Sequence, residues 1–349
     1  MAPPGSRGRG IRRGRDGHPR ICPGEDLVAE ARRRRSGDGS PVSTRALPSN
    51  GKRRGLEATS TAEHHFAILA LDHIGSMAEM MQPDDPATVT LDQIAVAKFE
   101  VARRLHPLAS AVLLDPLIGY AAGRIRPDLW DGTGLLLGIE ESDYSSIAAS
   151  PRIIDGWSVE RAAAAGAHAI KISFRFDPEG DTGDVERFVR DVVAECDRVD
   201  IPLFAEPLGV FRHPAERRRV IVEGARRFSR LGVDVLKLEF PEDVTAVADR
   251  RVWAEACAEV DSASAVPWTL LSAGEDFPRF RAMLEIACDA GASGFVAGRA
   301  VWRDAVLGSD AGSAWRHAAD RLGQLAQTTR ERARPWTSDD DRRTAGGGA

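Results

Sequence analysis

The segment RLGVDVLKLEF, residues 230–240, contains the end of a helix, a glycine and a strand. Gly232 stands where a helix commonly ends in a left-handed turn, and the apolar run after it is typical of a buried strand. Lys237 interrupts that run, and Glu239 follows on the same side of the strand because side chains alternate. A buried ammonium group is costly unless it finds a partner or loses its proton. The segment therefore predicts a covered strand with a lysine that has a chemical role.

Short apolar runs of this kind recur along the chain between stretches with helical periodicity. Helical stretches include 185–199, 215–232 and 277–291, and another follows at 313–333. Buried strands that alternate with helices predict an α/β fold, a closed (β/α)8 barrel of parallel strands. A doubly wound open sheet is the alternative, but LALDHIGSM (69–77) is not the Gly-rich loop expected after its first strand. The eight runs are 66–72, 110–115, 134–140, 168–174, 202–207, 233–239, 268–274 and 293–299.

The charge distribution and composition predict three parts. Residues 1–62 carry a net charge of +8, against −5 for the whole chain, and are rich in Gly, Pro and Ser. Such a composition buries little apolar surface, so we expect a disordered basic extension. Residues 63–335 are expected to form one barrel domain, with no internal boundary, and residues 336–349 a disordered tail. A nucleic-acid-binding arm, an organellar targeting segment and a mis-assigned start are further interpretations of 1–62, so we look for function after residue 62.

Composition also excludes some classes of protein. Hydrophobic residues make up 43% and charged residues 28% of the chain, as in soluble globular proteins. No apolar run approaches the roughly 18–20 residues that span a bilayer. The cysteines are scattered without a CxxC pair, which is typical of thiols in a reducing compartment. We therefore expect a cytoplasmic protein with no membrane partner and no nucleic-acid partner.

Polar residues lie near the carboxyl ends of the predicted strands, where barrel enzymes place their catalytic groups. They comprise Asp72, Lys171, Glu206, Lys237, Glu239 and Ser272, and the last strand runs into Gly298 and Arg299. Any one of them could be a solvated or structural charge, but buried charges are individually disfavoured and these converge on one face. Two neighbouring ammonium groups lower each other's pKa, and desolvation lowers it further. A neutral lysine amine is a nucleophile suited to a carbonyl carbon, so the pattern indicates Schiff-base chemistry.

Four segments resemble a known enzyme family. The chain reads IIDGWSV at 153–159, GVDVLKLEFP at 232–241, PWTLLSAGEDF at 267–277 and AGASGFVAGRAVW at 290–302. Together they resemble the class I aldolases that act on tagatose 1,6-bisphosphate or 6-deoxy-6-sulfofructose 1-phosphate. The resemblance covers roughly residues 66–308. It implies a (β/α)8 barrel and an imine-forming mechanism that needs no metal or other cofactor.

The resemblance also implies roles for individual residues. Lys237 matches the Schiff-base lysine, Lys171 the second lysine, Glu206 the acid/base carboxylate and Asp72 the aspartate after the first strand. The loops that hold the substrate phosphate match Ser272, Gly274, Gly298 and Arg299. Phosphate binding by these loops also agrees with the general behaviour of barrels.

One departure from the family concerns the other end of the substrate. The tagatose enzymes read LDQRG after the first strand, whereas this chain reads LDHIG at 71–75. His73 and Ile74 thus replace an amide and a cation that a second phosphate would favour. Arg175 could supply a replacement charge for a phosphate or a sulfonate, or it could be a solvated surface residue. Arg175 and His73 are therefore candidates for binding the distal group.

The sequence thus predicts a class I aldolase that cleaves a ketose 1-phosphate at C3–C4 into dihydroxyacetone phosphate and an aldehyde. Tagatose, fructose and sulfofructose skeletons all stay open. A metal-dependent aldolase is an alternative, although the histidines form no zinc-binding pattern. A barrel that binds a sugar phosphate as a regulatory protein is another. We expect a small sugar phosphate as the partner and, from the family, a homo-oligomer.

Overall fold

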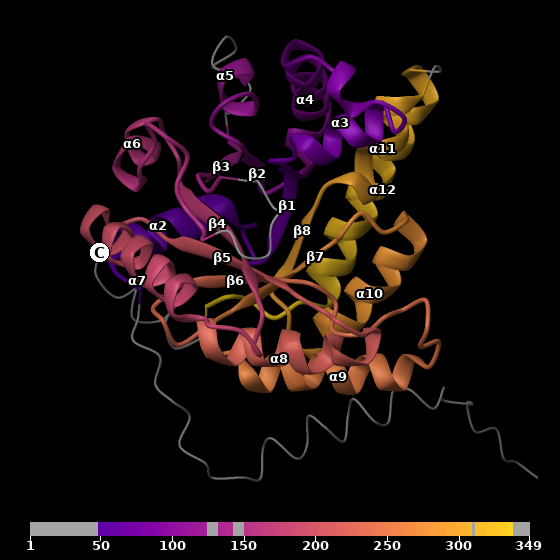
Figure 1. The fold of residues 1–349 in the computed structure, drawn as a ribbon. Coiled ribbons are helices and arrows are strands. Elements are labelled where there is room, and N and C mark those ends of the chain that lie inside the picture. Colours follow the sequence, from indigo (N-terminus) through magenta and orange to yellow (C-terminus); the bar gives the residue numbers. More distant parts are fainter. Residues whose placement is uncertain (1–47, 124–131, 142–149, 309–310, 338–349) are drawn as a thin grey trace, which may run out of the picture. The chain divides into compact units, whose positions relative to one another are not determined.

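A closed barrel of eight parallel strands forms the centre of the computed structural model, which describes residues 48–123, 132–141, 150–308 and 311–337 (Figure 1). The strands follow one another around the barrel in chain order, and β8 pairs with β1 to close it. This confirms the predicted (β/α)8 fold. The strands are β1 (Phe66–Leu71), β2 (Ala111–Leu114), β3 (Gly134–Gly138), β4 (Ala169–Phe176), β5 (Leu203–Gly209), β6 (Val235–Leu238), β7 (Trp268–Leu271) and β8 (Gly294–Ala297).

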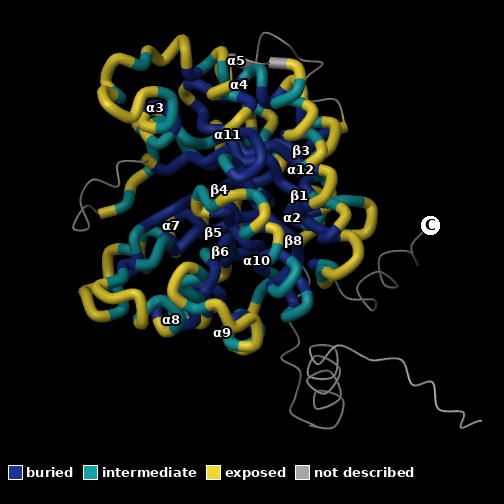
Figure 2. Tube along the Cα trace, turned by 90° about the vertical axis from the view of Figure 1, so that its right-hand side faces the viewer, coloured by how far each residue is buried: buried dark blue, intermediate teal, exposed yellow. Residues whose placement is uncertain are grey.

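Helices cover the outside of the strands, and Figure 2 shows buried strands inside a shell of partly exposed helices. Because both faces of each strand are covered, the strands are apolar almost throughout, as the sequence indicated. The helical segments are α2 (Asn50–Thr59), α3 (Gly75–Met81), η1 (Pro86–Thr88), α4 (Leu91–Leu105), η2 (His106–Leu108), α5 (Gly119–Gly123), α6 (Val159–Ala164), α7 (Gly183–Val199), η4 (Pro214–Glu216), α8 (Arg217–Phe228), α9 (Arg250–Ala263), α10 (Phe277–Ala290), α11 (Arg299–Leu307) and α12 (Ala311–Arg332).

Strand alternation decides which side chains face the barrel interior. In β1, Phe66, Ile68 and Ala70 belong to the inner apolar cluster, while Leu69 and Leu71 belong to the cluster under the helices. Phe66 and Phe204 pack edge to face inside the barrel, with ring centroids 5.3 Å apart. The amino-terminal part of the interior is therefore filled with apolar side chains, and polar residues are confined to the carboxyl ends of the strands.

A glycine ends α10 as the sequence predicted, whereas α8 ends earlier than predicted, at Phe228, with Ser229 as its C-cap. Gly291 caps α10 with a φ of 128°, and Gly232, with a φ of 98°, precedes β6. Both conformations lie in the left-handed region, which side chains with a Cβ rarely adopt. At the other end of α10, the Asp276 side chain accepts a hydrogen bond from the amide of Arg279. These local signals set where each strand begins and hence which residues reach the carboxyl end.

The prediction that residues 1–62 form a disordered extension is wrong for its last part. Residues 1–47 lie outside the described residues, but α2 packs against the start of the strands, and Leu56 is fully buried with the inner cluster. Lys52 is also buried and forms ion pairs with Asp197 at 2.6 Å and Asp234 at 3.1 Å. The sequence interpretation failed because α2 is short and basic, and its apolar contact rests on one leucine.

The predicted start of the tail at residue 336 is also wrong. Trp336 is buried with the inner cluster, its amide donates to His64 O at 3.0 Å, and its indole donates to Ser60 Oγ at 3.0 Å. The barrel domain therefore includes residues on both sides of the predicted range 63–335. Residues 338–349 of the predicted tail lie outside the described residues.

None of the helices in the described ranges is both long enough and apolar enough to cross a membrane. Cys196, Cys257 and Cys288 are buried and form no disulfide, as expected for separated thiols. Cys22 lies outside the described residues.

Candidate active site

A cluster of buried charges occupies the barrel interior at the carboxyl ends of the strands. Each member faces the barrel interior because it lies two or four residues after an inward-facing apolar residue of the same strand. Lys171 follows Ala169 in β4, Glu206 follows Phe204 in β5, and Lys237 follows Val235 in β6. The cluster consists of Asp72, Glu140, Lys171, Ser173, Glu206 and Lys237.

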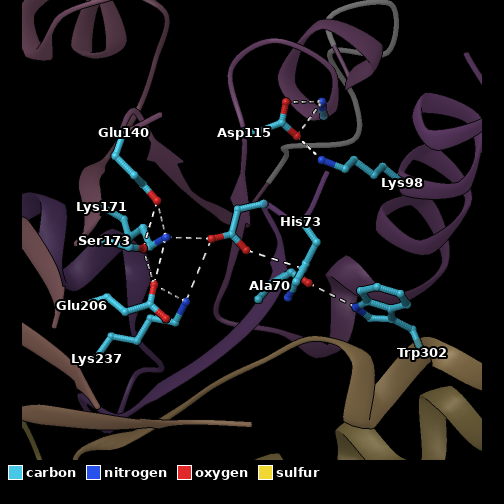
Figure 3. Close-up of polar contacts among 12 residues, drawn as sticks. Ala70, His73, Lys98, Asp115, Glu140, Lys171, Ser173, Glu206, Lys237 and Trp302 are labelled. Atoms are coloured by element: carbon cyan, nitrogen blue, oxygen red, sulfur yellow. Dashed lines mark hydrogen bonds and ion pairs between the residues drawn. The ribbon is translucent and has the colours of Figure 1, made fainter. Parts of the chain in front are cut away.

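Two lysines share one carboxylate in this cluster. Nζ of Lys237 lies 2.9 Å from Oε2 of Glu206, and Nζ of Lys171 lies 2.9 Å from the same oxygen. Figure 3 shows the two amino groups converging on Glu206. The relative exposure of each of the three residues is 6% or less. Water is therefore largely excluded from the ion pairs, which strengthens them.

The two lysines differ in the number of carboxylates around them. Besides Glu206, Nζ of Lys171 lies 2.9 Å from Oδ2 of Asp72 and 2.5 Å from Oε1 of Glu140. Lys237 has Glu206 at close range and Oδ2 of Asp72 at 4.0 Å. Three carboxylates stabilise the ammonium form of Lys171 strongly, whereas Lys237 has fewer such contacts. The geometry thus surrounds Lys171 with more carboxylate oxygens at short range than Lys237.

Burial and the neighbouring lysines have opposite effects on the pKa values of the carboxylates in this cluster. Burial favours the neutral acid, but Lys171 and Lys237 outweigh it for Asp72 and hold its pKa well below the usual value. The same two lysines lower the pKa of Glu206. For Glu140 burial dominates over Lys171, and its pKa is raised. Asp72 and Glu206 are therefore held ionised, and Glu140 takes up a proton more easily than an ordinary glutamate.

Glu140 and Ser173 belong to this cluster but were not among the predicted site residues. Ser173 Oγ lies 2.6 Å from Oε2 of Glu206 and 2.9 Å from Oε1 of Glu140. It thereby links the Glu140 carboxylate, after β3, to the Glu206 carboxylate, within β5. Both residues could have been predicted from the alternation of side chains along a strand. Glu140 ends the predicted run GLLLGIE, and Ser173 lies two residues after Lys171.

His73 lies between the charged cluster and the loop after β8. Its Nδ1 is 3.6 Å from Oδ1 of Asp72, beyond hydrogen-bond distance, and its ring packs edge to face on Trp302 at 5.7 Å (Figure 3). A Cβ added to Gly298 would come within 2.7 Å of Cε1 of His73. Burial, with help from Arg299 and the lysines, lowers the pKa of His73 to about 4 against the pull of Asp72. The ring is therefore neutral near neutral pH.

The residues predicted to hold a phosphate lie around the start of α11. Gly298 is the residue before that helix, and Arg299 is its first residue. Gly274, in the loop after β7, has a φ of 78°, and a Cβ there would lie 3.2 Å from Cζ of Arg299. Ser272 is buried at the end of β7. The two loops thus meet at a helix amino terminus, where amide groups and the helix dipole favour an anion.

The candidates for the distal group lie apart from each other. His73 contacts Gly298 and so belongs to the side of the barrel formed by β1 and β8. Arg175 lies on the same face of β4 as Lys171 and Ser173, one alternation beyond them, and is half-buried. Strand β4 pairs with β5 up to Phe176 and Gly209, which carries Arg175 above the cluster.

A second buried ion pair stands beside the cluster. Asp115 after β2 pairs with Lys98 from α4, and it accepts hydrogen bonds from the amides of Ile118 at 2.6 Å and Gly119 at 3.1 Å. These contacts occupy the Asp115 carboxylate and fix the loop after β2. Its role is therefore structural, although it faces inward by the same alternation.

Neither of two surface hollows coincides with this cluster. One of about 580 Å³ lies along α8 and is lined by arginines and glutamates, and one of about 400 Å³ lies at the η2 end of α4. Among the described residues, no group of three or more His, Cys, Asp or Glu side chains is arranged to hold a metal ion.

Comparisons with known proteins agree with this geometry. A family model described as "DeoC/LacD family aldolase" matches residues 66–304. Tagatose 1,6-diphosphate aldolase 1 of Streptococcus pyogenes serotype M1 is 32% identical over 320 residues, which cover 82% of this chain and 97% of the relative. Tagatose 1,6-diphosphate aldolase 2 of the same serotype is 31% identical over the same shares.

Solved structures with this fold include two fructose 1,6-bisphosphate aldolases. One, described as Schiff-base forming, has a TM-score of 0.55 and 18% identity, covering 79% of this chain and 98% of that chain. An archaeal one has a TM-score of 0.56 and 19% identity, covering 78% and 98%. At this level of identity the likeness concerns the fold.

Proposed function

This chain belongs to the DeoC/LacD family of aldolases, which are carbon–carbon lyases, and from that premise we propose that it cleaves a ketose 1-phosphate through a Schiff base on Lys237. The products are dihydroxyacetone phosphate and an aldehyde. The observation that carries this proposal is the position of Lys237 Nζ, buried inside the barrel and 2.9 Å from Glu206 Oε2. The names of the streptococcal relatives support a sugar bisphosphate as the substrate class.

Imine formation needs a free amine and a group that carries protons. A proton of the Lys237 ammonium group passes to Glu206, the freed amine attacks the ketone carbon, and a second Nζ proton moves to the carbonyl oxygen to give a carbinolamine. Glu206 then returns a proton to the hydroxyl, which leaves as water, and an iminium ion remains. The distance of 2.9 Å between Nζ and Oε2 suits this exchange.

Cleavage uses the iminium ion as an electron sink. Glu206, ionised again after the loss of water, takes the proton of the C4 hydroxyl, the C3–C4 bond breaks, and its electron pair moves to the iminium nitrogen to form an enamine. We assign orientation of the C3 and C4 hydroxyls to Asp72, which is held ionised, and stabilisation of the developing oxyanion to Lys171, which is held as a cation. Protonation of the enamine at C3 and hydrolysis of the imine then release the second product.

The phosphate at C1 anchors the substrate away from the reacting bond. Ser272, Gly274, Gly298 and Arg299 are the proposed binding residues. Binding energy from this non-reacting end contributes to orienting the carbonyl carbon toward Lys237. His73, which stands in the family's Gln-Arg pair position, lies beside Gly298 and hence near this phosphate, so Arg175 is the candidate that is left for the other end of the substrate. The homo-oligomeric state and the cytoplasmic location stay predictions.

A coupled assay that reports dihydroxyacetone phosphate tests this function. The substrates are tagatose 1,6-bisphosphate, fructose 1,6-bisphosphate and 6-deoxy-6-sulfofructose 1-phosphate, and the control enzyme is Lys237→Met. We expect one of them to be cleaved by the native chain and none by the variant. Absence of lyase activity on all three would contradict the proposed substrate class.

A further inference from the structure

Arg303, one turn after Arg299 on α11, is a residue that the phosphate site does not yet include. Residues four apart lie on the same face of a helix, so both guanidinium groups point to the same side. Nη2 of Arg303 donates a hydrogen bond to Gly274 O at 2.7 Å. Measured from the position of a Cβ on Gly274, Nη2 of Arg299 lies at 3.3 Å and Nη2 of Arg303 at 3.4 Å. Two arginines therefore flank the loop after β7.

No carboxylate forms a direct ion pair with either arginine in the described part of the chain, although Glu79 and Asp72 act on Arg299 from a longer distance. Within the described residues, the buried Nε of Arg299 has no hydrogen-bond partner. Arginines on the neighbouring surface differ, since Arg321 pairs with Asp304 and Arg279 with Glu275. Burial and the proximity of Arg303 lower the pKa of Arg299. Two adjacent, half-buried cations without a counter-ion indicate that an anion of matching charge completes the site.

We propose that Arg303 is the second cation of the phosphate site and makes the site selective for a doubly charged phosphate monoester over singly charged groups. This inference rests on the proposed function, which places the substrate's C1 phosphate between the loops after β7 and β8. A phosphate monoester is mostly dianionic above its second pKa of about 6. A dianion balances both guanidinium groups, whereas a sulfonate or another monoanion leaves one cation uncompensated in a partly desolvated place.

An alternative role for Arg303 is to fasten the β7 loop through Gly274 O. The two roles differ in what they predict for ligand charge. Loss of a loop anchor weakens all anions to a similar degree, because the amide groups of the loop are displaced for each of them. Loss of a binding charge weakens the dianion more than the monoanion. The two roles of Arg303 can therefore be distinguished by comparing the binding of two anions that have the same shape but different charges.

The experiment measures binding of methylphosphonate and methanesulfonate by calorimetry at pH 8.5 and low ionic strength. These tetrahedral anions share a methyl group and differ by one charge at that pH. We expect the native chain to prefer methylphosphonate at least about tenfold, as for a hydrogen bond between charged groups. Arg303→Gln should reduce that preference to about threefold or less, and Arg303→Lys should retain part of it. Arg187→Gln, an exposed arginine of α7, is the matched control and should change nothing.

Two outcomes would overturn the inference. One is a preference in Arg303→Gln equal to that of the native chain. The other is an equal weakening of both anions, which would assign Arg303 to the loop alone. Unfolding curves of each variant check that it is folded, and Arg303→Lys keeps the test decisive should Arg303→Gln be unstable. Failure of the aldolase function appears separately, as absence of lyase activity in a native chain that still discriminates between the two anions.

Discussion

Nζ of Lys171 and Nζ of Lys237 each lie 2.9 Å from the same atom, Oε2 of Glu206. Ser173 Oγ approaches that oxygen as well, at 2.6 Å. A carboxylate that receives three donors is strongly held in its ionised form, and its pKa is lowered. Glu206 therefore stands between a lysine fixed as a cation and a lysine that must exchange a proton, which makes it the central acid/base group of the proposed mechanism.

Replacement of Glu206 by glutamine tests this position. Glu206→Gln keeps the size of the side chain but cannot accept the proton of Lys237. We expect kcat to fall by about 10²- to 10⁴-fold, the usual contribution of positioned proton transfer. Steady-state kinetics measures the change, with Glu255→Gln on the exposed side of α9 as the control. A kcat within threefold of the native value would remove Glu206 from the mechanism.

The raised pKa of Glu140 predicts a pH-dependent effect. Ionised Glu140 helps to hold Lys171 as a cation, so native activity should fall as pH drops through the raised pKa of Glu140. Glu140→Gln resembles the protonated state at every pH. Its kcat/KM should therefore be about tenfold lower than native near pH 8, and the difference should close toward pH 5. A ratio that stays constant across this pH range would contradict the role given to Glu140.

His73 predicts a pH dependence of stability. Its pKa falls from 6.5 in the unfolded chain to about 4 in the fold, so the unfolded state binds the proton more tightly. The free energy of unfolding should then decrease as pH falls through 6.5 toward 4, by up to about 3 kcal/mol from this residue. Urea unfolding of the native chain and of His73→Gln between pH 7.5 and 4.5 isolates the effect. Parallel stability curves would show that His73 does not contribute.

The packing of α2 against the barrel predicts that two truncated chains differ in their free energy of unfolding. Deleting residues 1–47 retains α2, whereas deleting residues 1–62 removes Leu56 from the inner cluster and leaves buried Asp234 without Lys52. We expect the longer deletion to lower the free energy of unfolding by at least about 3 kcal/mol relative to the shorter one. Leu56→Ala in the full chain should lose about 2–5 kcal/mol. Equal urea midpoints for the two truncations would refute this account of α2.

Much of the site could be predicted because strand alternation is a local property. Once the apolar runs give the strands, Asp72, Lys171, Glu206 and Lys237 fall on inward-facing positions near the carboxyl ends, where the closed barrel brings them together. The identity of the partners could not be predicted in the same way. Which carboxylate meets which lysine depends on the register between neighbouring strands, and the sequence does not state that register.

The features that the sequence did not predict depend on long-range packing. Leu56 and Trp336 are far apart in the chain, yet both join the inner cluster of the barrel. Each lies in a segment whose composition is polar, and composition is a property of the segment, whereas burial is a property of the whole fold. Arg303 was missed for a related reason, since its contact with Gly274 joins the helix after β8 to the loop after β7.

The central claim is tested most directly by trapping the imine with borohydride during turnover of a ketose 1-phosphate, followed by tryptic peptide mapping. Reduction blocks cleavage after the modified lysine, so an adduct on Lys237 appears in peptide 231–250, and an adduct on Lys171 in peptide 162–175. We predict a single adduct, in 231–250, that is absent from Lys237→Met. An adduct confined to 162–175, or lyase activity that persists in Lys237→Met, would contradict the account.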